Sequence, residues 1–165
     1  MVKKTQKINQ LINIVRKYNY PISLKIRLGE NKLEKEKKVY LNLIKETNPD
    51  FFIVHARSGE DSYEEKADYA IFKECTITGK EIIANGDIDS IEKVKELKKV
   101  GVKGVMIGRR AVTNPAIFDE LKGNSIPQFK DLKSEYSMLA DKYHSKPRCK
   151  KNVLMRIGQV EEKIK

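Results

Sequence analysis

Short apolar runs and stretches of helical periodicity alternate along most of this chain. The runs at residues 51–55, 81–84 and 104–107 hold several apolar residues in succession, the run at 22–28 holds four apolar residues, and all four runs end at polar residues or glycine. Such runs are typical of strands that are buried on both faces of a sheet. Each is followed by enough residues for a helix, so the pattern predicts βα units and a parallel sheet.

Between these runs, apolar residues recur three and four positions apart, as they do on one face of a helix. The first such stretch covers residues 5–18, and its apolar face holds Ile8, Leu11, Ile12 and Val15. Further helices are predicted over residues 39–47, 63–74 and 89–100, and a short one is predicted to begin at Asn114-Pro115, with Pro at its first position.

Four successive βα units predict an α/β fold, either half of a TIM-type (β/α)₈ barrel or a small open sheet, because parallel strands require right-handed crossovers. A complete barrel needs about 250 residues, whereas this chain has 165. We therefore expect a half (β/α)₈ barrel over residues 1–121. A basic helical tail is expected over residues 122–165, after a linker at Gly123–Pro127.

The chain is strongly basic, with 34 Lys and Arg against 23 Asp and Glu and a net charge of +11. A surplus of this size favours nucleic acid as a partner, because each neutralised phosphate releases counterions. The alternative is the Lys/Glu-rich surface of a heat-adapted protein. The tail carries 11 basic and 5 acidic residues. Its candidate residues for contact with nucleic acid are Lys146, Arg148, Lys150 and Lys151.

Several classes of site and location are not expected. The two cysteines, Cys75 and Cys149, lie far apart and share no CxxC spacing, which argues against a structural zinc site or a disulfide framework and favours a reducing, cytoplasmic setting. No other spacing typical of a metal site is present. Neither a secretory signal nor a membrane-spanning segment is expected, because no apolar run approaches about 20 residues.

Polar residues collect at the predicted carboxyl ends of all four strands, where the active site of a βα barrel forms. Together they predict a site for an anionic ligand. Gly86 and Gly108 open loops that lead to helix N-termini, where backbone N–H groups and the helix dipole favour phosphate. The residues at these ends are Lys25 and Arg27, His55 and Arg57, Asn85-Gly86-Asp87, and Gly108-Arg109-Arg110.

Each candidate also has a simpler interpretation. Lys25 is compatible with a side chain that extends from a strand end into solvent, instead of one that holds an electron-rich ring or oxygen. For His55 we expect contact with a ligand rather than catalysis. Cys75 is expected to be a buried structural thiol, and no function is expected for Cys149.

Four segments in the same order resemble the tRNA-dihydrouridine synthases. They are LKIRLG at 24–29, IVHARS at 53–58, IIANGDIDS at 82–90 and GVMIGRRAVTNPAIF at 104–118. The resemblance covers about residues 10–120. It implies a (β/α)₈ barrel that binds FMN, uses NADPH as reductant and reduces uridine to 5,6-dihydrouridine in tRNA, with a C-terminal helical domain that helps to hold the tRNA.

The resemblance also implies roles for individual residues. Lys25 matches a lysine that contacts the flavin ring, and His55 matches a histidine at the flavin. Arg57 matches an arginine at the rim that meets substrate. The residues that match the loops binding the FMN phosphate are Asn85, Gly86, Asp87, Gly108 and Arg109.

The N-terminal half of the family pattern has no counterpart in this sequence. That half includes a Pro-Met stretch and a glutamine at the flavin, and an Asn-x-x-Cys-Pro loop with the catalytic cysteine. Neither Cys75 nor Cys149 has this context. We therefore assign no catalytic residue and expect the isolated chain to be inactive.

Three interpretations of the chain remain open. The main interpretation is the C-terminal half of a split or fragmentary dihydrouridine synthase that is active only with a partner. A half barrel exposes sheet edges, so we expect self-association or a partner chain that supplies the N-terminal half. The first alternative is a non-catalytic module that binds tRNA or flavin. The second is another phosphate-binding barrel, such as a relative of dihydroorotate dehydrogenase, and the basic tail argues against it.

Overall fold

A computed structural model describes residues 2–159, with side chains from Thr5 onwards, as two compact units. The first unit holds the residues up to Ile88 together with Glu92–Met106, and the second holds Asp89–Ile91 and the residues from Ile107 onwards. The chain therefore passes between units near Met106, whereas the sequence placed the boundary at 121/122. The assignment of separate flavin-phosphate and tRNA-binding parts stays a prediction.

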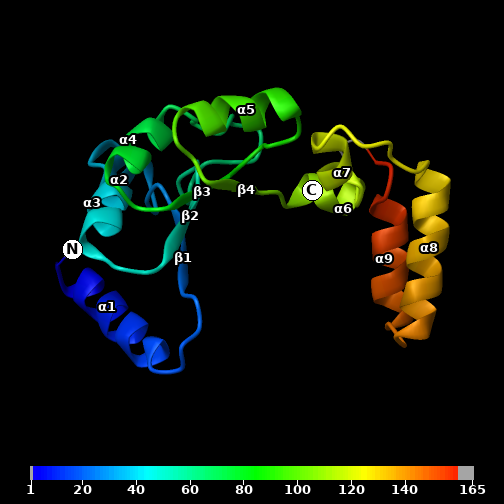
Figure 1. Cartoon of the computed structure of the whole chain (residues 1–165), viewed down its shortest axis with the longest axis horizontal. Coiled ribbons are helices and arrows are strands. Elements are labelled where there is room, and N and C mark those ends of the chain that lie inside the picture. Colours follow the sequence, from blue (N-terminus) through cyan, green and yellow to red (C-terminus); the bar gives the residue numbers. More distant parts are fainter. Residues whose placement is uncertain (1, 160–165) are drawn as a thin grey trace. The chain divides into compact units, whose positions relative to one another are not determined.

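The first unit is built on a sheet of four parallel strands in the order β1-β2-β3-β4 (Figure 1). This order confirms the predicted succession of βα units and the α/β fold. A consecutive parallel order is the arrangement of strands within a (β/α)₈ barrel. The strands are β1 (Ser23–Arg27), β2 (Phe51–His55), β3 (Ile82–Asn85) and β4 (Gly104–Met106).

Helices cover one face of this sheet. Phe52, Val54, Ile82 and Ala84 alternate along β2 and β3 and are completely buried. Figure 1 shows α3, α4 and α5 on the same side of the four strands. The helices of this part of the chain are α1 (Val2–Arg16), α2 (Lys32–Glu36), α3 (Val39–Glu46), α4 (Ile71–Ile77) and α5 (Ile91–Lys99).

Two of the predicted helices differ from the structure. The helix predicted over 63–74 begins only at Ile71. The backbone carbonyls of Tyr63 and Glu65 accept hydrogen bonds from the side chain of Arg57, in the loop after β2, and so are not available for helical hydrogen bonds. The first helix spans Val2–Arg16 instead of the predicted residues 5–18, and of its predicted apolar face only Ile12 is buried, while Leu11 is 62% exposed and Val15 is 43% exposed.

Helix α2 was not predicted, although the sequence contains its signal. The side chain of Asn31 accepts a hydrogen bond from the backbone N–H of Glu34 at 2.9 Å. The Glu34 carboxylate in turn accepts from the N–H of Glu30 at 2.9 Å. Asn-x-x-Glu thus acts much like a capping box, in which two backbone donors at a helix start are satisfied by side chains.

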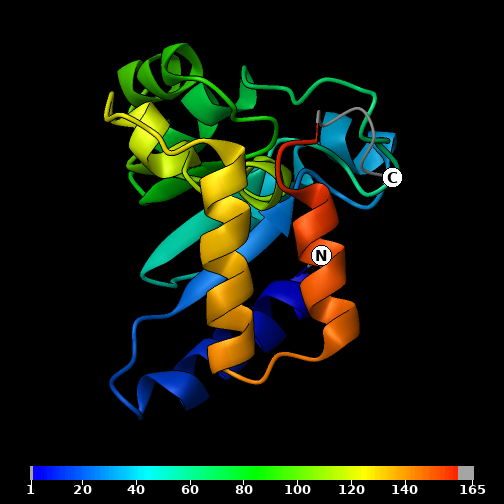
Figure 2. The same ribbon diagram turned by 90° about the vertical axis from the view of Figure 1, so that its right-hand side faces the viewer.

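The second unit is helical, as predicted for the tail. Its helices are α6 (Arg109–Thr113), α7 (Ile117–Leu121), α8 (Phe129–Lys142) and α9 (Pro147–Arg156). Figure 2 shows α8 and α9 side by side. The N–H of Gly158, after α9, donates to the carbonyl of Thr113 at 2.8 Å and ties this hairpin to α6.

The helix predicted to start near Asn114-Pro115 forms as α7, and the turn at Asn114 explains why it begins slightly later. The Asn114 side chain is buried and accepts a hydrogen bond from the N–H of Ala116 at 3.1 Å, which makes a turn that precedes the helix. Helix α7 therefore begins at Ile117. None of the helices within residues 2–159 has the length and apolar character that a bilayer crossing demands.

Candidate functional site

The carboxyl ends of three neighbouring strands place polar side chains in one row. Arg27, His55 and Asn85 are Cα partners across β1, β2 and β3. Lys25 lies two residues before Arg27 on the same face, because side chains alternate along a strand. Adjacent strands are about 4.8 Å apart, so these groups emerge close together. The predicted Lys25, His55 and Asn85 are thus brought onto one face, opposite the helices.

His55 is the titratable member of this row that stays uncharged at neutral pH. Its side chain is 7% exposed. Burial lowers the pKa of His55 to about 4, and the cations of Arg27, Lys25 and Arg57 act in the same direction. The carboxylate of Asp87 acts against them. At neutral pH the ring therefore carries one N–H donor and one acceptor and no charge.

The turn after β3 has room only for glycine at its centre. Gly86 has a φ of +118°, a conformation that L side chains rarely adopt. A Cβ there would lie 3.1 Å from Cδ2 of His55 and 3.2 Å from Cβ of Ala67. The hydroxyl of Tyr69 donates to the carbonyl of Gly86 at 2.7 Å, and the Asn85 side chain donates to the carbonyl of Met106 at 2.8 Å. These contacts fix the backbone of the turn.

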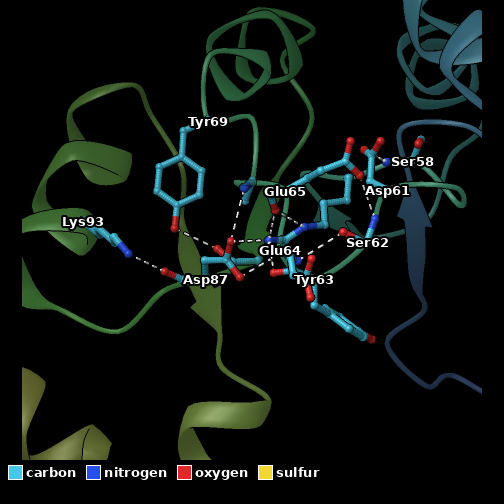
Figure 3. Close-up of polar contacts among 12 residues, drawn as sticks. Ser58, Asp61, Ser62, Tyr63, Glu64, Glu65, Tyr69, Asp87 and Lys93 are labelled. Carbon is cyan, nitrogen blue, oxygen red and sulfur yellow. Dashed lines mark hydrogen bonds and ion pairs between the residues drawn. The ribbon is translucent and has the colours of Figure 1, made fainter. Parts of the chain in front are cut away.

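Asp87 directs its carboxylate towards the loop after β2 (Figure 3). Its two oxygens accept from the Arg57 guanidinium, at 2.9 Å from Nη1 and 2.5 Å from Nη2. One oxygen also accepts from the N–H of Ala67 at 3.2 Å, and the backbone carbonyl of Asp87 accepts from Nζ of Lys93 at 2.8 Å. The negative charge of Asp87, whose side chain is 26% exposed, is therefore paired with the buried guanidinium of Arg57.

Arg57 is buried in the loop after β2. Its side chain is 1% exposed. Besides Asp87, it donates from Nε to the carbonyl of Glu65 at 2.9 Å and from Nη2 to the carbonyl of Tyr63 at 3.4 Å. The guanidinium is thus committed to protein groups in this structure, and the substrate contact that the resemblance implies for Arg57 stays a prediction.

Gly108 and Arg109 lie in the second unit at the start of α6. Gly108 is its N-cap residue, and the N–H of Ala111 donates to the Gly108 carbonyl at 3.0 Å. An ideal Cβ at Gly108 would meet no heavy atom within 4 Å. The glycine after β4 thus leads into the N-terminus of α6, a short helix that was not predicted from the sequence.

The basic residues of the tail differ in availability. Nζ of Lys150 lies 2.6 Å from both carboxylate oxygens of Asp141, so this lysine is paired. Arg148 and Lys151 on α9, and Lys146 before it, are exposed. At the turn between α8 and α9, Nζ of Lys142 lies 5.6 Å from the ring centroid of Tyr143, which is 70% exposed. The hairpin thus presents cations beside an exposed aromatic ring.

Both cysteines lie outside the strand ends. Cys75 is completely buried in α4, and burial raises the pKa of its thiol to about 12, helped by Glu74. Cys149 is exposed on α9 of the second unit. A thiol with a raised pKa is a poor proton donor and nucleophile at neutral pH. Neither cysteine therefore lies on β1, β2 or β3, the strands that carry Lys25, His55 and Asn85.

Comparison with known proteins decides the family. The sequence profile described as dihydrouridine synthase (Dus) matches residues 1–159. This chain belongs to the dihydrouridine synthase family. A "Probable tRNA-dihydrouridine synthase" of Helicobacter pylori is 39% identical over 109 residues, which is 62% of this chain and 32% of that protein. The "tRNA-dihydrouridine synthase B" of Pseudomonas syringae pv. tomato is 29% identical over 149 residues, 84% of this chain and 44% of that protein.

The chain spans between a third and a half of the length of these dihydrouridine synthases. The family fold is a TIM barrel, and the four parallel strands here correspond to part of it. The predicted family and fold class are thus confirmed.

Several residues of the site were not singled out from the sequence. Arg27 was noted at a strand end but not assigned to the flavin, although alternation from Lys25 would have placed it on the same face. Ala67, Tyr69 and Lys93 hold the Asn85-Gly86-Asp87 turn through contacts across the fold. No local sequence pattern reports such contacts.

Proposed function

We propose that this chain forms the FMN-phosphate side of a tRNA-dihydrouridine synthase, which reduces uridine to 5,6-dihydrouridine in tRNA with FMN and NADPH. The observation that carries the proposal is the row of Lys25, His55 and Asn85 on one sheet face, next to the glycine turn at 86. Together with Arg27, which lies on the same face, the row offers two cations, an uncharged imidazole and an amide, and these suit a flavin ring whose heteroatoms accept and donate hydrogen bonds.

The proposed roles follow from the chemistry of each group. The Lys25 ammonium offers a positive charge to the flavin ring, and Arg27 adds a second. The uncharged ring of His55 offers a hydrogen bond without adding to that charge. The Asn85-Gly86-Asp87 turn supplies backbone N–H groups for the phosphate. The contribution of Gly108 and Arg109 to phosphate binding stays a prediction from the resemblance. FMN, when bound, supplies the hydride chemistry for which NADPH is the reductant.

The cysteine to which the family resemblance assigns proton donation has no counterpart at the strand ends of this chain, because Cys75 and Cys149 lie on helices. The position and raised pKa of Cys75, and the location of Cys149 in the second unit, support an isolated chain that binds without completing the reaction. The same observations favour the second candidate function, a non-catalytic module that binds flavin or tRNA. NADPH oxidation by the isolated chain in the presence of FMN and tRNA separates the two, since only the enzyme would show uridine-dependent turnover.

Titration of the purified chain with FMN, followed by quenching of flavin fluorescence, tests the cofactor proposal. We expect saturable binding that weakens by about tenfold on Lys25→Gln, the loss of roughly one charge-assisted contact. Lys45→Gln, an exposed lysine on α3, is the matched control. Absence of saturable FMN binding by the unaltered chain would refute the proposal.

The tail is proposed to bind tRNA through its exposed cations. Replacing Lys146, Arg148 and Lys151 by glutamine should weaken tRNA binding and reduce the slope of log K against log salt by about two to three, since each phosphate contact contributes about 0.7 to 0.9. The matched control replaces Lys95, Lys98 and Lys99, exposed on α5, with the same change in charge. Equal losses in both variants would mean that net charge alone attracts the RNA.

A further inference from the structure

Arg57 is the largest completely buried side chain among the described residues of the chain. A buried guanidinium is stable only when its donors are satisfied and its charge is paired. Here the charge is paired with Asp87 in bidentate geometry, at 2.9 and 2.5 Å. Nε and Nη2 also donate to backbone carbonyls of the loop that follows β2. The residue therefore links two loops at the carboxyl end of the sheet.

The partner of this arginine lies in an unexpected chemical context. Asp87 is the third residue of the turn that is proposed to bind a phosphate dianion, and a free carboxylate there would repel the ligand. In the structure, the carboxylate is turned into the protein, where it accepts from Arg57 and from the N–H of Ala67. The backbone at Asp87 has a φ of +47°, a left-handed conformation that needs support from its surroundings.

We propose that Arg57 is a positioning residue for phosphate recognition: it holds the Asp87 carboxylate inward and so presents the backbone of the Asn85-Gly86-Asp87 turn to the anion. The proposal rests on the proposed function, in which this turn binds the FMN phosphate. It is an alternative to the substrate contact that the resemblance implies for Arg57.

The contacts around the pair explain how one side chain orders both loops. Arg57 binds the carbonyls of Tyr63 and Glu65, and the N–H of Ala67 binds Asp87, so the loop over 63–67 closes onto the turn. Ala67 in turn packs against Gly86. Loss of the guanidinium would release the carboxylate towards the ligand and would loosen this loop at the same time.

Comparison of FMN with riboflavin isolates the phosphate, because the two flavins share the ring and differ in that group. Dissociation constants are measured by fluorescence titration for the unaltered chain, Arg57→Gln and Arg57→Lys. We expect both variants to bind FMN at least about tenfold more weakly, the loss of about one charge-assisted hydrogen bond, with riboflavin affinity changed by less than about threefold. Arg57→Lys keeps the charge and removes the bidentate geometry, so it stays informative where Arg57→Gln does not fold.

Arg16→Gln is the matched control, because Arg16 pairs with Asp50 at 3.5 Å on the surface of the same unit. It should leave both dissociation constants unchanged. Equal losses for FMN and riboflavin in the Arg57 variants would overturn the positioning role in favour of a general effect on the fold. Unchanged flavin binding with weakened tRNA binding would overturn it in favour of direct contact with substrate.

Amide hydrogen exchange separates this inference from the proposed function. In Arg57→Lys we expect faster exchange at Ala67 and across residues 85–88, and unchanged exchange in the interior of β2. If the unaltered chain binds neither flavin, the proposed function fails, and the exchange result still decides whether Arg57 orders the two loops. Unchanged exchange at these positions would overturn the inference whatever the flavins do.

Discussion

His55 stays uncharged because burial and three neighbouring cations disfavour its protonated form. Its pKa is lowered from 6.5 to about 4. Above pH 6.5 the ring is neutral in both the folded and unfolded chain, so it contributes no pH dependence there. Between pH 6.5 and 4 the unfolded chain takes up a proton that the folded chain does not, and stability must fall as the pH falls.

The free energy of unfolding should therefore decrease between pH 6.5 and 4, with His55 contributing up to about 1.4 kcal/mol per pH unit. Urea unfolding at a series of pH values measures this slope, and His55→Gln is expected to remove the contribution of the ring. An NMR titration of the imidazole provides the direct check. Protonation of the His55 ring close to pH 6.5 would contradict the environment described here.

Single residues of the site were only partly predictable. The positions of Lys25, His55 and Asn85 near the strand ends could be predicted because the strands are local features of the sequence, whereas their roles at a cofactor stay predictions. The burial of Arg57 could not be predicted because it depends on Asp87, thirty positions along the chain. The tail shows the same limit: the sequence gives no sign that Lys150 pairs with Asp141 while Lys151 stays exposed.

At the scale of elements, the turn after β3 combines positive φ with close packing. Gly86→Ala should destabilise the chain by at least about 1 kcal/mol more than Gly79→Ala, because alanine at 86 adds crowding to the roughly 1 kcal/mol cost of a left-handed backbone. Gly79 is the control because its φ is +75° and its Cβ would meet nothing within 4 Å. Chemical unfolding of both variants measures the difference. Equal losses of unfolding free energy would show that His55 and Ala67 shift to make room for the added methyl group.

The strands were more predictable than the helices. Phe51–His55 was predicted with the bounds that the structure has, because four apolar residues in succession, followed by a polar one, leave few alternatives. Residues 63–70 carry a helical spacing of Tyr63, Ala67 and Ala70, but their backbone groups bind Arg57, Asp87 and Ala56 instead. Tertiary hydrogen bonds thus override a local periodicity that is correct in itself.

At the scale of the whole molecule, the outer edges of β1 and β4 pair with no other strand within residues 2–159. Unpaired edges of a parallel sheet favour pairing with another chain. Light scattering should therefore give a mass that rises with protein concentration. The increase should persist at about 0.5 M salt, which screens surface charges but leaves backbone hydrogen bonds and apolar burial intact. A monomer at every concentration would contradict this prediction.

The contrast between the two thiols has a practical consequence. Cys75 on α4 is buried, whereas Cys149 on α9 is exposed on the basic hairpin that α8 and α9 form. A maleimide dye should thus modify one cysteine per folded molecule and two after denaturation. Without any engineering, the chain carries a single attachment point for a fluorophore beside the cations proposed to meet RNA, and the count of labelled sulfurs reports whether the α4 core is intact.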